Sequence, residues 1–366
     1  MSILHLPLST PLFNKSIFMK KILLVLCFVV LAGIGCVNVK TKTTDNGGAF
    51  VTDDAGAKWT AKSALPLAAG ISSISGVDVT KMIVDPNDDD AIYLGTQENG
   101  LLVSYDNAES WQRIKADELR GGWINGVAVD PTNRCVVYVA KGANVMKSTD
   151  CNRTYDTQAF VETSGKTVNV VRVDWYNPSI VWLGTASGDV VKSVDTGKTW
   201  STVARAKDDI VDIQVDNADS RIILAITARR GMWRTTDGGT TWSNMDEAFK
   251  SFRDIGVEYA LSQTKDGSLI YLVSDYGILR SADHGATWEA LTLLTKPGSV
   301  RIYAMAVNPV DANSIYYGTA TTLYSTTDGG VNWATRQLPT SRATSVLVVD
   351  PNDTSVLYLG AATVEK

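Results

Sequence analysis

The chain has 366 residues, of which 45% are hydrophobic and 20% charged, and its formal net charge is −5. This length exceeds what one compact core usually needs, and the acidic charge disfavours nucleic acid, whose binding depends on neutralising phosphates. With two histidines, of which His284 lies in a turn, the sequence offers no His/Cys ligand cluster. We therefore expect neither a metal nor a cofactor.

The N-terminal segment predicts export. Lys20 and Lys21 precede an apolar run, residues 22–32, that is too short and wrongly flanked for a transmembrane helix. The run ends in Gly-Ile-Gly-Cys36, which resembles a bacterial lipoprotein signal in which Cys36 carries the lipid. Ordinary signal cleavage followed by secretion remains the alternative. Met19 is the expected true start.

These features divide the chain into three parts. Residues 1–35 are the predicted signal peptide, residues 36–47 a lipidated cysteine with a short polar tether, and residues 48–366 the folded body. Removing the three lysines of residues 1–35 takes the net charge from −5 to −8. We expect a monomer outside the cytoplasm that touches the membrane only through its lipid.

The body repeats one turn motif seven times, Ser/Thr-x-Asp-x-Gly-x-x-Trp. In such a turn the Asp carboxylate accepts backbone N–H groups, Gly takes a positive φ, and Trp begins the next strand. Two copies are degenerate: the second has Ala108 at the Gly position, and the third has Asn152 and Tyr155 at the Gly and Trp positions. The motif aspartates, 42 to 52 residues apart, are Asp54, Asp106, Asp150, Asp195, Asp237, Asp283 and Asp328.

A fixed period of about 45 residues indicates a repeat architecture. Each repeat reads as three short strands rich in Val, Ile and Tyr, followed by the motif and a fourth strand. Seven four-stranded units predict an all-β, seven-bladed β-propeller. The first motif has no strand pair before it and the last strand pair, residues 345–366, has no motif after it. We therefore expect the N-terminal strands to join the C-terminal blade and close the ring.

Cys135 and Cys151 remain once the leader and Cys36 are set aside. With the hairpin turn centred near Gly142, residues whose numbers sum to about 285 face each other, which places Cys135 beside position 150. We expect a disulfide between Cys135 and Cys151, and therefore an oxidising compartment.

In a propeller of this type the motif turns lie on one face, and the loops before the inner strands lie on the other with the second hairpin turns. The motif aspartates are thus expected to be structural. The opposite face carries Lys81, Asp212 and an arginine in most blades, a side chain suited to carboxylates and backbone carbonyls. The candidate binding residues on that face are Arg120, Trp123, Arg172, Arg229, Arg230, Arg253, Arg301, Tyr303 and Arg342.

The seven motifs resemble the Asp-box (BNR) repeats of sialidases, xyloglucanase-type glycoside hydrolases, sortilin-type receptors and the photosystem II stability/assembly factor family. The phrases IYLGT and GLLVSYD in a single exported ring look most like the assembly-factor propellers. That resemblance implies a non-enzymatic role in binding or assembling an exported or membrane protein.

The alternative is a glycoside hydrolase acting on extracellular glycans. The Arg-Ile-Pro segment typical of sialidases is absent. Xyloglucanase-type enzymes use two propellers flanking a cleft, and this chain supplies one. If the protein is an enzyme, its acids are expected among Asp78, Asp209 and Glu258, because a glycosidase needs two carboxylates.

Overall fold

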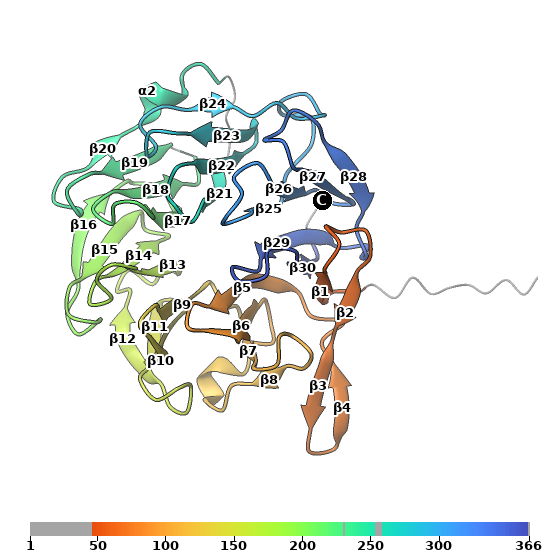
Figure 1. Ribbon diagram of the computed structural model, residues 1–366. Helices are drawn as coiled ribbons and strands as arrows, with labels where there is room; N and C mark the ends of the chain where they lie inside the picture. Colours follow the sequence, from red (N-terminus) through yellow and green to blue (C-terminus); the bar gives the residue numbers. More distant parts are fainter. Residues whose placement is uncertain (1–45, 230, 253–257, 365–366) are drawn as a thin grey trace, which may run out of the picture. The chain divides into compact units, whose positions relative to one another are not determined.

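This computed structural model describes residues 46–229, 231–252 and 258–364, so the predicted signal peptide and Cys36 lie outside the described residues. Seven four-stranded antiparallel sheets are arranged as the blades of a ring (Figure 1), and the inner strands of six of them line a cavity in its central channel. The predicted all-β, seven-bladed propeller is therefore confirmed.

Six blades are each built from four consecutive strands, the first of which lies nearest the channel. Blade 1 contains β5 (Val79–Asp85), β6 (Asp88–Thr96), β7 (Leu101–Ser104) and β8 (Gln112–Arg113). Blade 2 contains β9 (Gly126–Asp130), β10 (Asn133–Lys141), β11 (Asn144–Ser148) and β12 (Asp156–Val161). Blade 3 contains β13 (Val168–Val173), β14 (Val181–Thr185), β15 (Asp189–Ser193) and β16 (Ser201–Arg205).

Blades 4 to 6 follow the same order around the ring. Blade 4 contains β17 (Ile210–Val215), β18 (Ile223–Thr227), β19 (Met232–Thr235) and β20 (Ser243–Asn244). Blade 5 contains β21 (Glu258–Gln263), β22 (Ile270–Ser274), β23 (Gly277–Ser281) and β24 (Glu289–Ala290). Blade 6 contains β25 (Ala304–Val307), β26 (Ile315–Gly318), β27 (Thr322–Thr326) and β28 (Ala334–Gln337).

Blade 7 is assembled from both ends of the body. Its inner strands are β29 (Ala343–Val349) and β30 (Leu357–Ala362), and its outer strands are β1 (Gly48–Thr52) and β2 (Thr60–Lys62). β1 pairs with β30 in antiparallel register, with Phe50 opposite Leu359. The predicted closure of the ring by the N-terminal strands is confirmed.

Three short elements have no counterpart in the repeat and were not predicted from the sequence. They are a separate hairpin of β3 (Ala64–Leu67) and β4 (Gly70–Ser73), a 3₁₀ turn η1 (Asp117–Leu119) and one helical turn α2 (Asp246–Phe249). The hairpin projects outward from the rim below β2 (Figure 1).

The core consists of apolar layers between neighbouring blades, because each strand alternates side chains toward the blade before it and the blade after it. The Trp of an Asp box fills part of such a layer. Trp242 of blade 4 meets the fully buried Trp182 of blade 3 edge to face, with ring centroids 6.3 Å apart. Trp200 of blade 3 meets Phe160 of blade 2 in the same way, at 5.5 Å. The repeated aromatic plates therefore join blade to blade.

Each Asp box is closed by the same three hydrogen bonds. In the fifth box the Thr235 hydroxyl donates to Asp237 Oδ1 (2.8 Å) and accepts the N–H of Gly239 (3.0 Å), while Asp237 Oδ1 also accepts the N–H of Thr241 (2.9 Å). The two residues after the aspartate, Gly238 and Gly239, both have positive φ, 68° and 89°. The motif is a turn whose polar groups are satisfied within the turn.

The two degenerate boxes keep this geometry. Ala108 takes a φ of 63° and Asn152 a φ of 66°. Asn152 adds bonds that no Gly could make, because its amide donates to Tyr93 Oη (2.8 Å) in blade 1 and its Oδ1 accepts from Tyr155 Oη (2.6 Å). Both replacements therefore adopt the positive φ that the turn requires, and Asn152 also links blade 2 to blade 1.

Beside this box, Cys135 and Cys151 form the predicted disulfide. The strand register places Val137 opposite Ser148, whose numbers sum to 285 as expected. The bond therefore links the first residues of β10 to the box turn after β11.

An ion pair also crosses the seam where the ring closes. Arg342, just before β29, lies with Nη1 2.8 Å from Asp78 Oδ1, just before β5, and also donates to the Gly76 carbonyl. Asp78 Oδ1 accepts the backbone N–H of Thr363, after β30 (2.6 Å). The Arg342 and Asp78 side chains are only 11% and 22% exposed. Asp78 thus holds blade 1 to both inner strands of blade 7.

We expect Asp78→Ala to lower the free energy of unfolding by about 2 kcal/mol, because a charge-assisted pair and a backbone bond are lost together. Urea unfolding monitored by tryptophan fluorescence measures this change. Glu289→Ala is the matched control, since it removes an ion pair with Arg280 whose carboxylate is mostly exposed. Its cost should stay below about 1 kcal/mol. Equal effects of the two substitutions would argue against the role assigned to the seam.

The Asp boxes predict acid sensitivity with a defined sign. Hydrogen bonds from the hydroxyl four residues later lower the pKa of Asp150, Asp195 and Asp237 to about 2, from an ordinary value of 3.8. A pKa lowered by folding stabilises the protein above the unfolded value and ceases to do so as pH falls through the folded value. Burial raises the pKa of Asp85 and Asp174, which offsets part of this effect.

We therefore expect the melting temperature to be nearly constant above about pH 5 and to fall between about pH 4 and pH 2. Asp237→Asn should lower the melting temperature at pH 7 and make this acid decline shallower, because one of the titrating boxes is removed. Thermal unfolding followed by circular dichroism at each pH tests this. An acid decline of unchanged steepness would contradict the assignment.

Candidate binding face and central channel

The two ends of the blades differ in the turns they carry. On one end the box turns lie against the first hairpin turns, as where Thr196 N donates to the Ser179 carbonyl. On the other end the loops between blades lie against the second hairpin turns, as where Gly122 N donates to the Glu98 carbonyl and Val168 N to the Gly142 carbonyl. We call this second end the box-free face.

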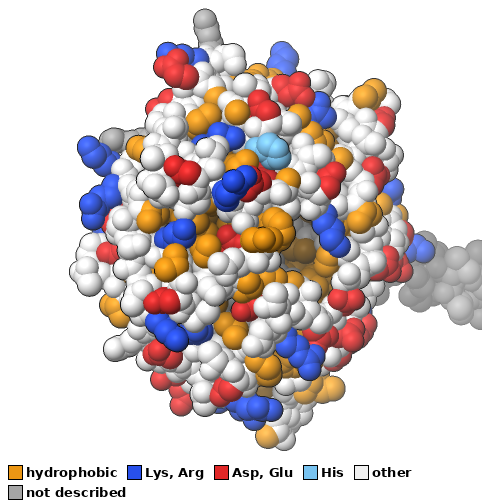
Figure 2. Space-filling model, turned by 60° about the vertical axis from the view of Figure 1, so that its left-hand side comes forward, with side chains coloured by type: hydrophobic (Ala, Val, Ile, Leu, Met, Phe, Trp, Pro, Cys, Tyr) orange, Lys and Arg blue, Asp and Glu red, His pale blue; other side chains and the backbone are white. Residues whose placement is uncertain are grey.

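The central channel contains a cavity of about 440 Å³. Its wall is formed by the inner strands of six blades and is mainly apolar, with Met82, Val127 and Val346 among its residues. Figure 2 shows a hollow near the middle of the molecule with hydrophobic side chains at its bottom and charged side chains around it. Lys81, Arg172 and Tyr303 are among the polar side chains in this wall.

Arg172 and Lys81 lie near one buried carboxylate. Arg172 Nη2 is 2.6 Å from Asp212 Oδ1, and Asp212 Oδ2 accepts the N–H of Leu261 in blade 5 (3.0 Å). Burial lowers the pKa of Lys81, which Asp212 opposes and Arg172 reinforces. Lys81, Arg172 and Asp212, from three different blades, thus lie close enough to influence one another electrostatically.

A second cluster is formed by two residues of blade 5 and two residues of the loop that precedes β25 of blade 6. These residues are Tyr259, Asp275, Arg301 and Tyr303. The Arg301 guanidinium is stacked over two rings, 4.8 Å from the centroid of Tyr259 and 5.2 Å from that of Tyr303. The Tyr259 hydroxyl donates to Asp275, and burial, followed by this bond, raises the pKa of Tyr259 to about 12. Stacking on two aromatic faces fixes the guanidinium in position.

Arg229 lies in a separate polar cavity of about 530 Å³, which Asp208 and Asp209 also line. Its backbone N–H donates to Asp208 Oδ2 (2.6 Å), while its side chain is 75% exposed and only 3.8 Å from Asp208 Oδ1. Arg120 is bound locally, to Asp117 and to the carbonyls of Ile114 and Lys115. Arg230 and Arg253 lie outside the described residues.

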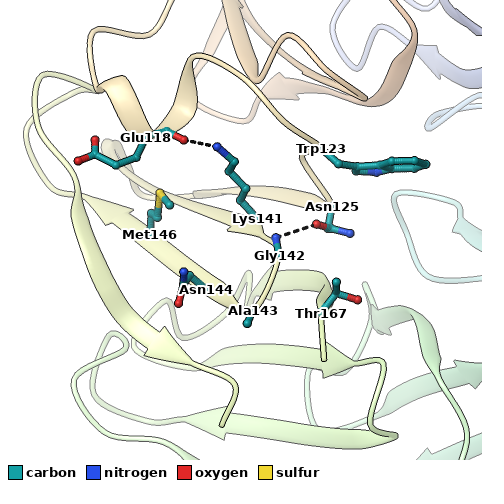
Figure 3. A pocket seen from close by; sticks show the side chains of 9 residues that line it. All are labelled: Glu118, Trp123, Asn125, Lys141, Gly142, Ala143, Asn144, Met146 and Thr167. Atoms are coloured by element: carbon teal, nitrogen blue, oxygen red, sulfur yellow. Dashed lines mark hydrogen bonds between the residues drawn. The ribbon is translucent and has the colours of Figure 1, made fainter. Parts of the chain in front are cut away.

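Trp123 marks a third cavity, of about 770 Å³, at the box-free end of blade 2. The ring is 51% exposed. Figure 3 shows Lys141 directed to the Glu118 carbonyl and Asn125 directed to the backbone N–H of Gly142, with Met146 and Asn144 on the same wall. The sequence identified Trp123 but not Lys141, Glu118 or Met146, because three separate segments meet there.

The acids considered for catalysis are not brought together. Asp78 is bound to Arg342 before β5, whereas Asp209 precedes β17, and β9 and β13 lie between these two inner strands. The Glu258 side chain lies outside the described part of the structure. The sequence did not predict the contacts of Tyr259, the next residue, because its pattern there is that of an ordinary strand.

Within the described ranges, no group of three or more His, Cys, Asp or Glu side chains is placed to hold a metal ion. The same ranges contain no helix long and apolar enough to span a membrane.

Comparison with known proteins gives two kinds of relative. Residues 203–344 match the family model described as photosynthesis system II assembly factor YCF48. A segment of 102 residues is 29% identical to an oligoxyloglucan-reducing end-specific xyloglucanase of Emericella nidulans, and it covers 27% of this chain and 12% of that enzyme.

Solved structures show the same division. The chain resembles YCF48 bound to a D1 peptide with a TM-score of 0.61 and 14% identity, over 79% of this chain and 94% of that one. It resembles the GH74 enzyme of Niastella koreensis with a TM-score of 0.61 and 17% identity, over 78% of this chain but 51% of the enzyme. The chain therefore spans about half of that enzyme. It is an Asp-box propeller similar to the YCF48 assembly factors and to the propellers of GH74 xyloglucanases.

Proposed function

We propose that this protein is an extracytoplasmic, non-enzymatic propeller that binds a segment of an exported or membrane protein through its box-free face. The observation that carries the proposal is the set of cationic and aromatic groups at and within the channel. Lys81 and Arg172 lie in the wall of the channel, and the Arg301 guanidinium lies over the rings of Tyr259 and Tyr303. A peptide segment that carries a carboxylate suits these groups.

The comparisons support a protein partner. YCF48 has been solved with a D1 peptide, and this chain covers nearly the whole of that propeller. The GH74 enzyme of Niastella koreensis is matched over about half of its length. The partner is inferred by its chemistry, as an exposed protein segment with an acidic group.

The proposed location rests on two features. The Cys135–Cys151 disulfide suits an oxidising compartment. The second feature is the sequence of residues 1–36, which resembles a lipoprotein signal ending at Cys36. These residues lie outside the described residues, and lipid anchoring through Cys36 is therefore part of the proposal. An anchored propeller would be concentrated at the membrane where its partners are inserted.

A glycoside hydrolase is the second candidate. It is favoured by the likeness to xyloglucanases and by the cavity at Trp123, where an exposed aromatic ring lies beside the amides of Asn125 and Asn144. A sugar ring offers an apolar face and hydroxyl groups that suit such a wall. Hydrolysis would also require two carboxylates within about 5 to 10 Å, and Asp78 and Asp209 lie on blades that are not neighbours.

The test is a charge reversal on the box-free face. We expect Arg229→Glu/Arg301→Glu to weaken binding of partner segments at least about tenfold, because two attractive charges become repulsive. In-cell crosslinking with mass spectrometry identifies the partners, and peptides from the crosslinked segments then give affinities. Arg221→Glu is the control, since this side chain is also 75% exposed and its backbone contacts a box turn.

If the double reversal retained every partner that the control retains, protein binding through this face would be refuted. Release of oligosaccharides from xyloglucan by the purified protein, abolished by Asp209→Asn, would establish the enzyme instead.

A further inference from the structure

The β3–β4 hairpin is one of the described elements that neither the repeat nor the proposed binding face explains. It is inserted between β2 and β5, and it forms a sheet of its own. In Figure 1 it extends away from the ring at the rim, next to β2. Such a projection exposes both faces of a two-stranded ribbon, which is marginally stable unless something holds its base.

The base of the hairpin is firmly attached to the propeller. Leu65 and Ile74 are 4% and 0% exposed, and both pack in the apolar layer between blades 7 and 1 together with Trp111. The Ala64 carbonyl accepts the backbone N–H of Trp111 (2.8 Å), and Ile74 N donates to the Ser63 carbonyl (2.9 Å). The hairpin therefore projects as an ordered arm.

The tip is apolar on both sides. Ile71 is 81% exposed and Leu67 46% exposed, and Pro66, Ala68 and Ala69 are exposed with them. Pro66 faces Ile71 across the pair, whereas Leu67, one residue on, points to the opposite side. No charged residue occurs between positions 63 and 77. An apolar tip without a polar side suits immersion better than it suits docking on one flat protein surface.

The hairpin also lies where the body begins. Gly47 N donates to the Ser75 carbonyl (2.6 Å) and Gly48 N to the Val77 carbonyl (2.7 Å), so the first described residues run beside the segment that follows β4. Nine residues, 37–45, separate Cys36 from the first described residue, Asn46. A chain of nine residues can span up to about 32 Å, whereas the four residues of β3 rise only about 13 Å.

We propose that the tip of the β3–β4 hairpin is a second membrane contact, in which Leu67 and Ile71 enter the boundary between headgroups and acyl chains. The proposal rests on the membrane tether of the proposed function. One lipid chain binds a bilayer only marginally, so a second weak contact strengthens the attachment and fixes which way the propeller faces. Beyond Ala64, the outer backbone edges of the arm have no strand partner within the described chain. Only the tip is therefore expected to enter, since deeper insertion would bury those polar groups in hydrocarbon.

The experiment uses the full chain, exported and purified with Cys36→Ser in every version, so that no acyl chain contributes. Partition onto vesicles of phosphatidylethanolamine and phosphatidylglycerol is measured by sedimentation for the hairpin variant Leu67→Ser/Ile71→Ser. The control variant is Val310→Ser/Val331→Ser, which removes two valines that are 69% and 79% exposed elsewhere on the surface. Any contribution of the N-terminal segment is the same in both.

We expect the partition coefficient of the hairpin variant to fall at least about tenfold while the control stays within about twofold of the parent protein. Binding of the parent should persist in 0.5 M NaCl, since the hairpin carries no charge. Both variants should melt within about 2 °C of the parent, because the altered side chains are exposed.

Equal partition of the hairpin and control variants would overturn the proposal. So would a parent dimer in sedimentation velocity that the hairpin substitutions dissociate, because the arm would then bind a second copy. Neither result depends on Arg229 or Arg301, so failure here is distinct from failure of the proposed peptide-binding face.

Discussion

The pairing of β1 with β30 is the interaction on which the rest of the structure depends. Five residues of the N-terminal strand, from Gly48 to Thr52, are paired with Ala361 to Leu357. Without them blade 7 would end in the open edge of β30, and the apolar layers on either side of that blade would be exposed. The ion pair of Asp78 and Arg342 secures the same seam from the box-free face. Because the ring is closed, we expect the seven blades to unfold together.

The Asp boxes make the two ends of the ring different in structure. Each box satisfies its own hydrogen bonds and places an aromatic plate between blades, so one end of the ring is occupied by self-contained turns. The loops of the other end are free to vary in sequence without disturbing these turns. Arg172 lies on the inner strand β13, whereas Arg301 lies in the loop that leads into the inner strand β25.

Most of the architecture could be predicted from the sequence, since local rules decide it. A turn that needs Asp, a positive φ and an aromatic residue at fixed spacing recurs seven times, and the unmatched ends imply closure. The same hairpin arithmetic placed Cys135 beside Cys151. The β3–β4 hairpin escaped prediction because residues 64–73 have no counterpart in the other repeats and carry only a short alternation.

The sites were harder to predict, because long-range contacts decide them. Sequence spacing placed Arg342 and Arg172 on the box-free face, but it did not reveal that Asp78 and Asp212 bind them. The cavity at Trp123 combines three segments whose loop conformations follow no period. The sequence therefore predicted which residues lie on this face. It did not predict the ion pairs that distinguish a structural arginine from an exposed one.

Hydrogen–deuterium exchange of β1 tests the closure of the ring most directly. If β1 is an integral strand of blade 7, the backbone amides of Gly48–Thr52 that bond to β30 should exchange as slowly as those of β30 itself, through global unfolding. Exchange of β1 within seconds, as expected of a frayed terminus, while β30 and blades 1 to 6 stay protected, would contradict this account.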